Sequence, residues 1–332
     1  MRLGDAEKTD GRAGRLLRAL LAVLVVAAVV VPLTAAARPD IPAPVPAPAL
    51  PLTAATLEKT YAANRANAEL ASRMAQGNGD RHRAEADRRL AALDRRLLSF
   101  DGRGEGRATE VFGDLAHAHR VAVLVPGSDT TLDTYERFRA GADALYRRLT
   151  REGPAGSGAA VIAWLGYTTP GTISTTVLTP DRAQEAAPDL RDLVAGLRAL
   201  TGPGAEVSVL CHSYGTVVCA RAADGLDADD MVLLASPGTG ADSAADLDTR
   251  ARVWAARGAD DWVADVPHTS ARLFGTTIGF GTDPVSPAFG ARVFAAGDGG
   301  HSDYFTPGSV SLANLTRIVL GESTEVTRVH HT

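Results

Sequence analysis

The sequence predicts an α/β fold, a mostly parallel sheet flanked by helices, preceded by a helical hairpin. Short apolar runs of strand length recur between residues 121 and 296, and several end in polar or glycine-rich turns. Turns at the carboxyl ends of parallel strands are where such sheets hold their sites. A chain of 332 residues with 45% hydrophobic composition can bury one sizeable core, so one α/β domain with smaller segments attached is expected.

The first element is a targeting segment. Several arginines precede an apolar run over residues 19–31, and small residues follow up to Ala37. This order is typical of a secretory signal that is cleaved after Ala37. An uncleaved membrane anchor is the alternative, because the run approaches the length that spans a bilayer. We therefore assign residues 1–37 to a signal peptide or membrane anchor, and expect the protein to be exported, either secreted or held on the outer side of the cell membrane.

A linker and a hairpin follow. Residues 38–51 are proline-rich and predict an extended spacer of polyproline type. Residues 52–100 predict a helical hairpin, with helices over 53–74 and 81–98 separated by a glycine-containing turn. A brace packed against the main domain is the favoured interpretation, and a lid or docking arm is the alternative. The main domain is expected over 101–322, followed by a polar tail over 323–332.

The first strand of the site is the apolar run 121–125. It breaks into a small, polar loop at Gly127 and Ser128, before a helix over 132–149. A loop between a strand and a helix can present backbone N–H groups to a developing oxyanion. Gly127 and Ser128 are the predicted donors, although a plain turn and helix cap would use the same residues.

The most informative segment is 206–220, an apolar strand that runs into Ser213, turns sharply and continues as a helix of small residues. Such a turn holds a nucleophilic hydroxyl clear of its own backbone and close to the N–H groups of the next helix. The N–H of Tyr214 is then a third oxyanion donor. Cys211 replaces the first glycine of the usual Gly-x-Ser-x-Gly pattern, at a position that must be small because the helix packs close to it. An ordinary strand-to-helix turn is the alternative.

The chain has only two cysteines, Cys211 and Cys219. One ends a strand and the other lies about two helical turns beyond, so we expect that they do not reach disulfide geometry. Both are interpreted as small buried residues.

An acid and a base are needed after the serine, in that order. Two short buried strands, 231–236 and 252–256, follow, and Asp261 comes just past the second. Asp261 is the predicted acid. Asp260 is the alternative, because a one-residue slip in the turn exchanges them. A pair of aspartates that only solvates the turn is the remaining alternative.

His301 is the predicted general base. It follows the strand 291–296 and a loop with three glycines, which can bend the imidazole back over the edge of the sheet. A histidine that only caps the terminal helix is the alternative, and His268 is the other contender. His212 is expected to point to the opposite side. Four further histidines precede a strand or lie in the tail: His117, His119, His330 and His331.

These motifs resemble those of the actinobacterial α/β-hydrolase family that is labelled as a domain of unknown function. The resemblance covers about residues 52–320 and rests on five segments: Val125-Pro126-Gly127, Cys211-His212-Ser213-Tyr214-Gly215 in place of Gly-His-Ser-Tyr-Gly, Asp261-Trp262-Val263, Phe280-Gly281-Thr282-Asp283-Pro284-Val285 and Gly300-His301-Ser302-Asp303-Tyr304-Phe305. It implies an α/β-hydrolase fold and an esterase or lipase type of activity, and it names no substrate. It also draws attention to Asp283 as an alternative acid.

Two loops are expected to border the serine because they follow strand ends. They span 166–180 and 268–289, and their apolar and threonine-rich character suits a hydrophobic acyl chain. Tyr167, Phe274 and Phe280 are the candidate residues that line the substrate. The segment between the strands 231–236 and 252–256 is too short for a large helical cap.

The predicted function is a serine hydrolase that cleaves carboxylic esters without a metal or an organic cofactor, with lipidic esters as one candidate class of substrate. A net charge of -5 with no basic stripe argues against a nucleic-acid partner. The expected partners are a small-molecule or lipid ester and, through an uncleaved N-terminal segment, a membrane. A peptidase or amidase of the same fold and a catalytically silent binding module of the cell envelope are the alternatives.

Overall fold

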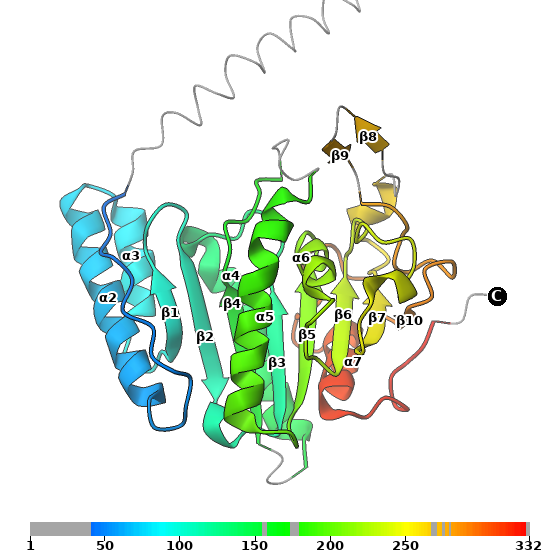
Figure 1. Cartoon of the computed structure of the whole chain (residues 1–332), viewed down its shortest axis with the longest axis horizontal. Helices are drawn as coiled ribbons and strands as arrows, with labels where there is room; N and C mark the ends of the chain where they lie inside the picture. Colours follow the sequence, from blue (N-terminus) through cyan, green and yellow to red (C-terminus); the bar gives the residue numbers. More distant parts are fainter. Residues whose placement is uncertain are drawn as a thin grey trace, which may run out of the picture. The chain divides into compact units, whose positions relative to one another are not determined.

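A sheet of eight strands, in the order β1-β2-β4-β3-β5-β6-β7-β10, lies at the centre of residues 42–332, which cluster as one unit (Figure 1). The computed structural model describes residues 41–154, 158–172, 179–266, 271–273, 276–278 and 280–329. The strands of this sheet are β1 Leu97–Asp101, β2 Arg107–Gly113, β3 Arg120–Val125, β4 Ala159–Leu165, β5 Glu206–His212, β6 Asp230–Leu234, β7 Arg252–Ala256 and β10 Arg292–Val293.

The sheet is mostly parallel, as predicted. In this sheet β2 pairs antiparallel with both β1 and β4, whereas the pairs along β4-β3-β5-β6-β7-β10 are all parallel. The middle strands are buried on both faces, which explains their continuous apolar sequence. The carboxyl ends of β3, β5 and β7 therefore meet at one edge. A separate antiparallel pair is formed by β8 Ala271–Leu273 and β9 Thr276–Ile278.

Helices cover both faces of the sheet (Figure 1). Helices α5 Asp181–Thr201 and α6 Gly215–Ala222 share one apolar cluster with one face, to which β3 contributes Val121, Val123 and Val125. Helices α4 Tyr135–Glu152 and α7 Val310–Leu320 share a second cluster with the other face, to which β3 contributes Ala122 and Leu124. The alternation along β3 is the period of two that a strand imposes. The fold class predicted from the sequence is confirmed.

The hairpin differs from its prediction in its second half. Helix α2 spans Leu57–Gly77, but α3, Arg81–Leu90, ends well before residue 98, and the remaining residues form β1 at the edge of the sheet. The spacing of apolar residues did not distinguish the short helix α3 from the edge strand β1, which begins at Leu97 after an irregular segment. The Asn64 side chain of α2 donates hydrogen bonds to the carbonyls of Leu97 and Leu98, at 3.1 and 3.0 Å. These contacts make the hairpin a brace of the sheet rather than a lid.

The two ends of this unit also pack on it. The Asn67 side chain of α2 donates to the Val45 carbonyl at 3.0 Å, so the described part of the proline-rich segment lies along α2. At the other end, Ala295 N–H donates to the Thr327 carbonyl and Val329 N–H donates to the Val293 carbonyl. Residues 327–329 of the expected tail are thus hydrogen-bonded to the edge of the sheet. The predicted signal or anchor, residues 1–37, lies outside the described residues, and none of the helices described is long and apolar enough to cross a membrane.

Candidate active site

Ser213 stands at the corner between β5 and α6. Its φ of 54° is in the left-handed region, which is strained for a residue with a side chain and typical of functional turns. The Ser213 N–H donates to the Leu234 carbonyl of β6, at 2.9 Å, which holds the corner to the sheet. A Cβ at Gly215 would lie 2.5 Å from the Pro126 carbonyl oxygen, so glycine is required where α6 begins against the end of β3.

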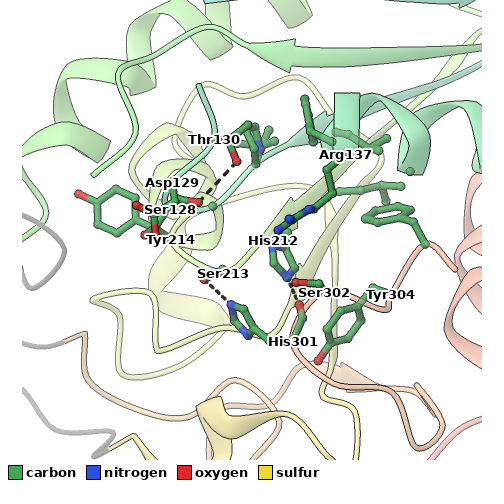
Figure 2. A pocket seen from close by; sticks show the side chains of 18 of the residues that line it. Ser128, Asp129, Thr130, Arg137, His212, Ser213, Tyr214, His301, Ser302 and Tyr304 are labelled. Carbon is green, nitrogen blue, oxygen red and sulfur yellow. Dashed lines mark hydrogen bonds between the residues drawn. The ribbon is translucent and has the colours of Figure 1, made fainter. Parts of the chain in front are cut away.

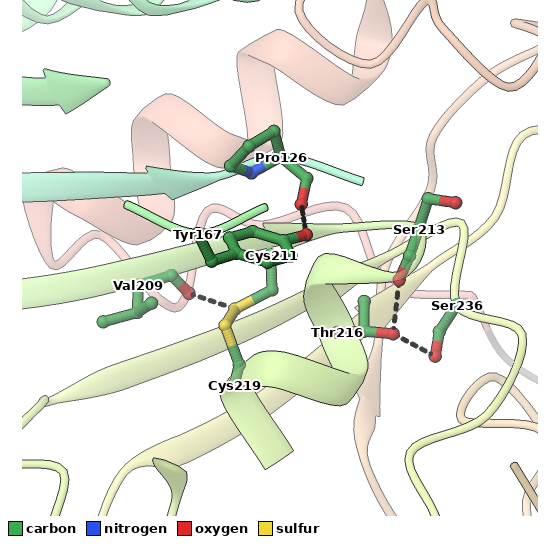
Figure 3. The surroundings of a disulfide bond; sticks show 8 residues. All are labelled: Pro126, Tyr167, Val209, Cys211, Ser213, Thr216, Cys219 and Ser236. Atoms are coloured by element: carbon green, nitrogen blue, oxygen red, sulfur yellow. Dashed lines mark hydrogen bonds between the residues drawn. A yellow bond between two sulfur atoms is a disulfide. The ribbon is translucent and has the colours of Figure 1, made fainter. Parts of the chain in front are cut away.

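The two cysteines correct the prediction, because they form a disulfide (Figure 3). Cys211 of β5 and Cys219 of α6 have Cα atoms 6.4 Å apart, and both side chains are buried. The separation along the chain was misleading, since the corner at Ser213 reverses direction and brings the second turn of the helix back over the strand. The side chain at position 211 does face the helix, as its small size required, but it is bonded to it rather than merely packed.

Ser213, His301 and Asp261 are joined by hydrogen bonds. The Ser213 Oγ lies 3.0 Å from His301 Nε2, and His301 Nδ1 lies 2.9 Å from Asp261 Oδ1 (Figure 2). Because an ionised carboxylate only accepts, Nδ1 carries the proton and Nε2 is left to accept from the serine hydroxyl. The three side chains come from turns after β5, β7 and β10, and the carboxyl ends of the parallel strands bring them to one edge.

The carboxylate of Asp261 is buried and fully engaged. Burial opposes its ionisation, but hydrogen bonds from His301, from the Tyr304 hydroxyl at 2.6 Å and from the Val263 N–H at 3.0 Å outweigh burial and lower its pKa. Burial and this contact with Asp261 raise the pKa of Tyr304, so its hydroxyl stays a donor. Asp261 therefore presents a fixed negative charge to His301.

The two alternative acids lie elsewhere. Asp260 is exposed. Asp283 forms an ion pair with Arg257 at 2.6 Å, and its other carboxylate oxygen accepts from the Val285 N–H. Neither has a hydrogen bond to His301 in the part of the chain that is described. His268, the other candidate base, lies outside the described residues.

The prediction that His212 points away from the site is wrong. Its Nε2 lies 2.6 Å from the His301 carbonyl oxygen, and its ring lies against the rings of His301 and Tyr304, with centroids 4.8 and 5.7 Å away. Burial, with a contribution from His301, lowers the pKa of His212 to about 4. The neutral ring donates from Nε2 to the carbonyl and so holds the backbone of the histidine loop against β5.

The predicted oxyanion donors lie beside the serine. A Cβ at Gly127 would lie 2.6 Å from Ser213 Cβ and 3.2 Å from its Oγ, so Gly127 abuts the nucleophile and no side chain fits there. The backbone N–H groups of Ser128 and Tyr214 have no hydrogen-bond partner among the described residues. They are positioned to bind an oxyanion that develops at Ser213.

A cavity of about 1390 Å³ opens over the serine. It is lined by Ser213, His301 and Ser128 and, on its apolar walls, by Phe138, Gly141, Ala144, Val263, Val266, Phe280 and Phe305. Phe280 thus occupies the place expected of it, whereas Phe274 lies outside the described residues.

The prediction that Tyr167 lines the substrate is wrong. Its ring is buried, and its hydroxyl donates to the Pro126 carbonyl at 2.7 Å, next to Gly127 and Ser128 (Figure 3). Tyr167 therefore supports this loop and is not among the residues that line the cavity.

A protein-family model described as Alpha/beta hydrolase matches residues 101–271, more than half of the sequence. The chain belongs to the alpha/beta hydrolase family. The matched residues include β2 to β7, with the corner at Ser213 and the turn at Asp261, but not the loop of His301. This alpha/beta hydrolase therefore has the fold class that its recurring short apolar runs predicted.

The chain is also similar to two uncharacterized proteins of Mycobacterium tuberculosis, from strains CDC 1551 and H37Rv. Each is 32% identical over 246 residues, which is 66% of this chain and 37% of the relative. This alpha/beta hydrolase spans little more than a third of the length of these relatives.

Solved structures with a similar arrangement include an α/β serine hydrolase without lid from Xanthomonas campestris, with 17% identity and a TM-score of 0.41 over 69% of this chain and 94% of that one. Another is esterase PE8, with 17% identity and a TM-score of 0.42 over 63% of this chain and 95% of that one.

Three residues around the hydrogen-bonded chain of Ser213, His301 and Asp261 were not assigned to the site from the sequence. Tyr304, His212 and Trp262 all contact Asp261 or His301, and the half-exposed Trp262 ring lies 4.6 Å from the His301 ring. Each is adjacent in sequence to a predicted site residue or within three residues of one. That proximity was the available signal, but it does not tell which neighbours turn inward.

Proposed function

We propose that this alpha/beta hydrolase is a serine hydrolase that cleaves carboxylic esters through an acyl-enzyme. The single observation that carries the proposal is the hydrogen-bonded chain from Ser213 through His301 to Asp261, at 3.0 and 2.9 Å. A serine on a strained corner, a base with a free lone pair and a buried acid are the parts that nucleophilic acyl transfer needs.

The mechanism follows from the positions of these atoms. His301 Nε2 takes the proton of the Ser213 hydroxyl as Oγ attacks the ester carbonyl carbon. The oxygen of the tetrahedral intermediate is bound by the N–H groups of Tyr214 and of the loop at Gly127 and Ser128. His301 then gives the proton to the leaving alcohol, and water, activated by the same nitrogen, releases the acid. Asp261 keeps the imidazole in the correct tautomer throughout.

An apolar acyl or alcohol group is the favoured substrate part. The cavity of about 1390 Å³ has room for a medium or long chain, and its lining includes phenylalanine and valine side chains. We therefore favour lipidic esters over short polar ones.

We also propose that the enzyme acts outside the cytoplasm, either secreted or held on the membrane. The basic and apolar N-terminus supports export. The Cys211–Cys219 disulfide supports it independently, because such bonds persist in oxidising compartments. The mass of the mature protein tests this part: cleavage after Ala37 leaves a chain that begins at Arg38, and a retained anchor leaves the full length.

A fluorophosphonate probe tests the catalytic part. We expect the wild-type protein to be labelled and Ser213→Ala to lose labelling, with turnover of 4-nitrophenyl hexanoate reduced by a factor of about 10³ or more. Ser302→Ala is the matched control, because Ser302 lines the same cavity and has no bond to His301 Nε2 in the described part of the chain. Folded wild-type protein that is not labelled at neutral pH favours a silent binding module. Turnover of a 4-nitroanilide that exceeds that of the matched ester favours an amidase.

A further inference from the structure

Arg137 stands out among the charged residues of the cavity. It lies in the first turn of α4 and lines the cavity, and Figure 2 shows its side chain extending from the helix into this space. Each of the other four arginines of α4 forms an ion pair with a carboxylate: Arg139 with Glu110, Arg147 with Asp143, Arg148 with Glu152 and Arg151 with Glu152. Arg137 has no ion pair within the residues that the structure describes.

The position of Arg137 in its helix is electrostatically unfavourable. The first turn of a helix carries the positive end of the macrodipole, where a cation is disfavoured. The neighbouring Glu136 does not relieve it, because its carboxylate pairs with Arg95 at 2.6 Å. Arg137 is exposed, so water solvates its guanidinium, which adds a positive charge without an ion pair among the described residues to a positive helix end; both attract an anion.

The other ionised side chains of the cavity are already engaged. The two carboxylate oxygens of Asp129 accept from the Thr172 N–H, at 3.2 and 3.1 Å, and Asp143 pairs with Arg147. Figure 2 shows Asp129 apart from Arg137. Its negative charge disfavours an anion on its own side, so a bound anion is directed to the side of α4.

We propose that Arg137 binds an anionic group of the substrate, a carboxylate or a phosphate, while the apolar walls hold the chain and Ser213 attacks the ester. This inference rests on the proposed ester hydrolysis and adds the class of substrate: an amphiphilic ester with one negative charge. Guanidinium groups form paired hydrogen bonds with both kinds of anion.

The test compares pairs of esters that differ by one anionic group. 4-Nitrophenyl hexanoate is set against the 4-nitrophenyl monoester of adipic acid, which places a carboxylate on the acyl side. Dihexanoylglycerol is set against dihexanoylglycerol phosphate, which places a phosphate on the alcohol side. We expect the wild-type enzyme to favour the anionic member of at least one pair by about tenfold in kcat/KM, mainly through KM, with the preference weakened at high salt.

Variants separate Arg137 from the general field of the protein. Arg137→Gln is expected to abolish the preference and leave the neutral esters within about twofold, and Arg137→Lys to keep part of it. Arg147→Gln is the matched control, since Arg147 lines the same cavity but is paired, and the preference is expected to remain. Equal turnover of both members of each pair by the wild type, or a preference that survives in Arg137→Gln, overturns the proposal.

A binding measurement keeps this proposal separate from the catalytic one. Monoethyl adipate and ethyl hexanoate are titrated onto Ser213→Ala and onto Ser213→Ala/Arg137→Gln, and binding is followed by ligand-observed NMR. Tighter binding of the adipate that requires Arg137 supports the anion site even if no ester is hydrolysed. Equal binding of the two ligands to Ser213→Ala, together with Ser213-dependent turnover of the hexanoate, removes the anion site and leaves the esterase.

Discussion

At the scale of single residues, the site depends on side chains that act on His301 from two directions. Asp261 binds its ring at Nδ1, and His212 binds its backbone carbonyl. Burial lowers the pKa of His212 to about 4, so this ring is neutral at neutral pH. Its contact with the loop is therefore independent of pH above that value.

Tyr304 gives the sharpest test at this scale. Tyr304→Phe removes the hydroxyl that donates to Asp261 at 2.6 Å and leaves the rest of the ring in place. A hydrogen bond to a charged group contributes about 1.5–3 kcal/mol, and part of it supports the imidazolium in the transition state. We expect kcat to fall about tenfold with KM nearly unchanged, measured on 4-nitrophenyl hexanoate.

Tyr146→Phe is the control for this change, because Tyr146 lies in α4 and its ring contacts Phe112 rather than the site. Unchanged kcat in Tyr304→Phe, with the protein still folded, would show that Asp261 does not need this donor.

The sequence predicted the three residues of the hydrogen-bonded chain because each follows a strand, and the order of the strands fixes which turns meet. It did not predict Tyr304 and His212 as their partners, since the direction of a side chain in a loop depends on tertiary packing. Tyr167 shows the same limit, because an aromatic residue in a loop near the site turned beneath the chain instead of into the cavity.

At the scale of elements, the disulfide ties strand β5 to helix α6 on both sides of the serine. The loop that it closes is short, with a sequence separation of 8 residues, and closing such a loop contributes roughly 2–3 kcal/mol on the chain-entropy model. We expect Cys211→Ala/Cys219→Ala to unfold about 3–5 °C lower than the wild type in calorimetry.

The same pair of cysteines gives a chemical check. Thiol titration of the denatured, unreduced protein is expected to find both cysteines oxidised. Free thiols at both positions would show that the disulfide does not form. An unchanged Tm in the double variant would show that it does not stabilise the turn at Ser213.

Helix α3 carries a buried acid that makes stability depend on pH. Burial raises the pKa of Asp87 to about 7, although the charge of Arg83 lowers it, and the carboxylates of Asp133 and Asp80 raise it further. An acid with a pKa raised in the folded state binds its proton more tightly there, so the protein loses stability as the pH rises from the unfolded value near 3.8 to about 7.

Asp87→Asn is expected to remove this loss and to unfold at a higher temperature than the wild type at pH 8, with a smaller difference at pH 5. The exposed Asp94→Asn is the matched control. An equal dependence on pH in the wild type and in Asp87→Asn would contradict the assignment.

At the scale of the whole molecule, the residues from Pro42 onward cluster as one unit, separate from the N-terminal segment. A chain that begins at Pro42 is therefore expected to keep its Tm within about 2 °C and its ester turnover. A chain that begins at Leu52 loses the contact between Val45 and Asn67 and is expected to unfold at a lower temperature. Calorimetry of the two shortened chains, beside the full chain, checks this, and equal values for both would show that the proline-rich segment adds nothing.

The fold class was predictable because strands buried on both faces read as unbroken apolar runs, and β3, β5, β6 and β7 all have this form. The edge strands were not predictable, since β1 is short and begins within the segment expected to be helical, and β10 has only two residues. An edge strand is defined by its neighbours more than by its own sequence.

Pairing of residues 327–329 with the segment at β10 occupies backbone groups along that margin of the sheet. Arg328 also lies over the ring of Trp254, 4.7 Å from its centroid, and fastens the segment in place. An edge strand with unpaired backbone N–H and C=O groups is a template for pairing with other chains, which leads to aggregation. Residues 327–329 thus shield this margin of the sheet from pairing with other chains.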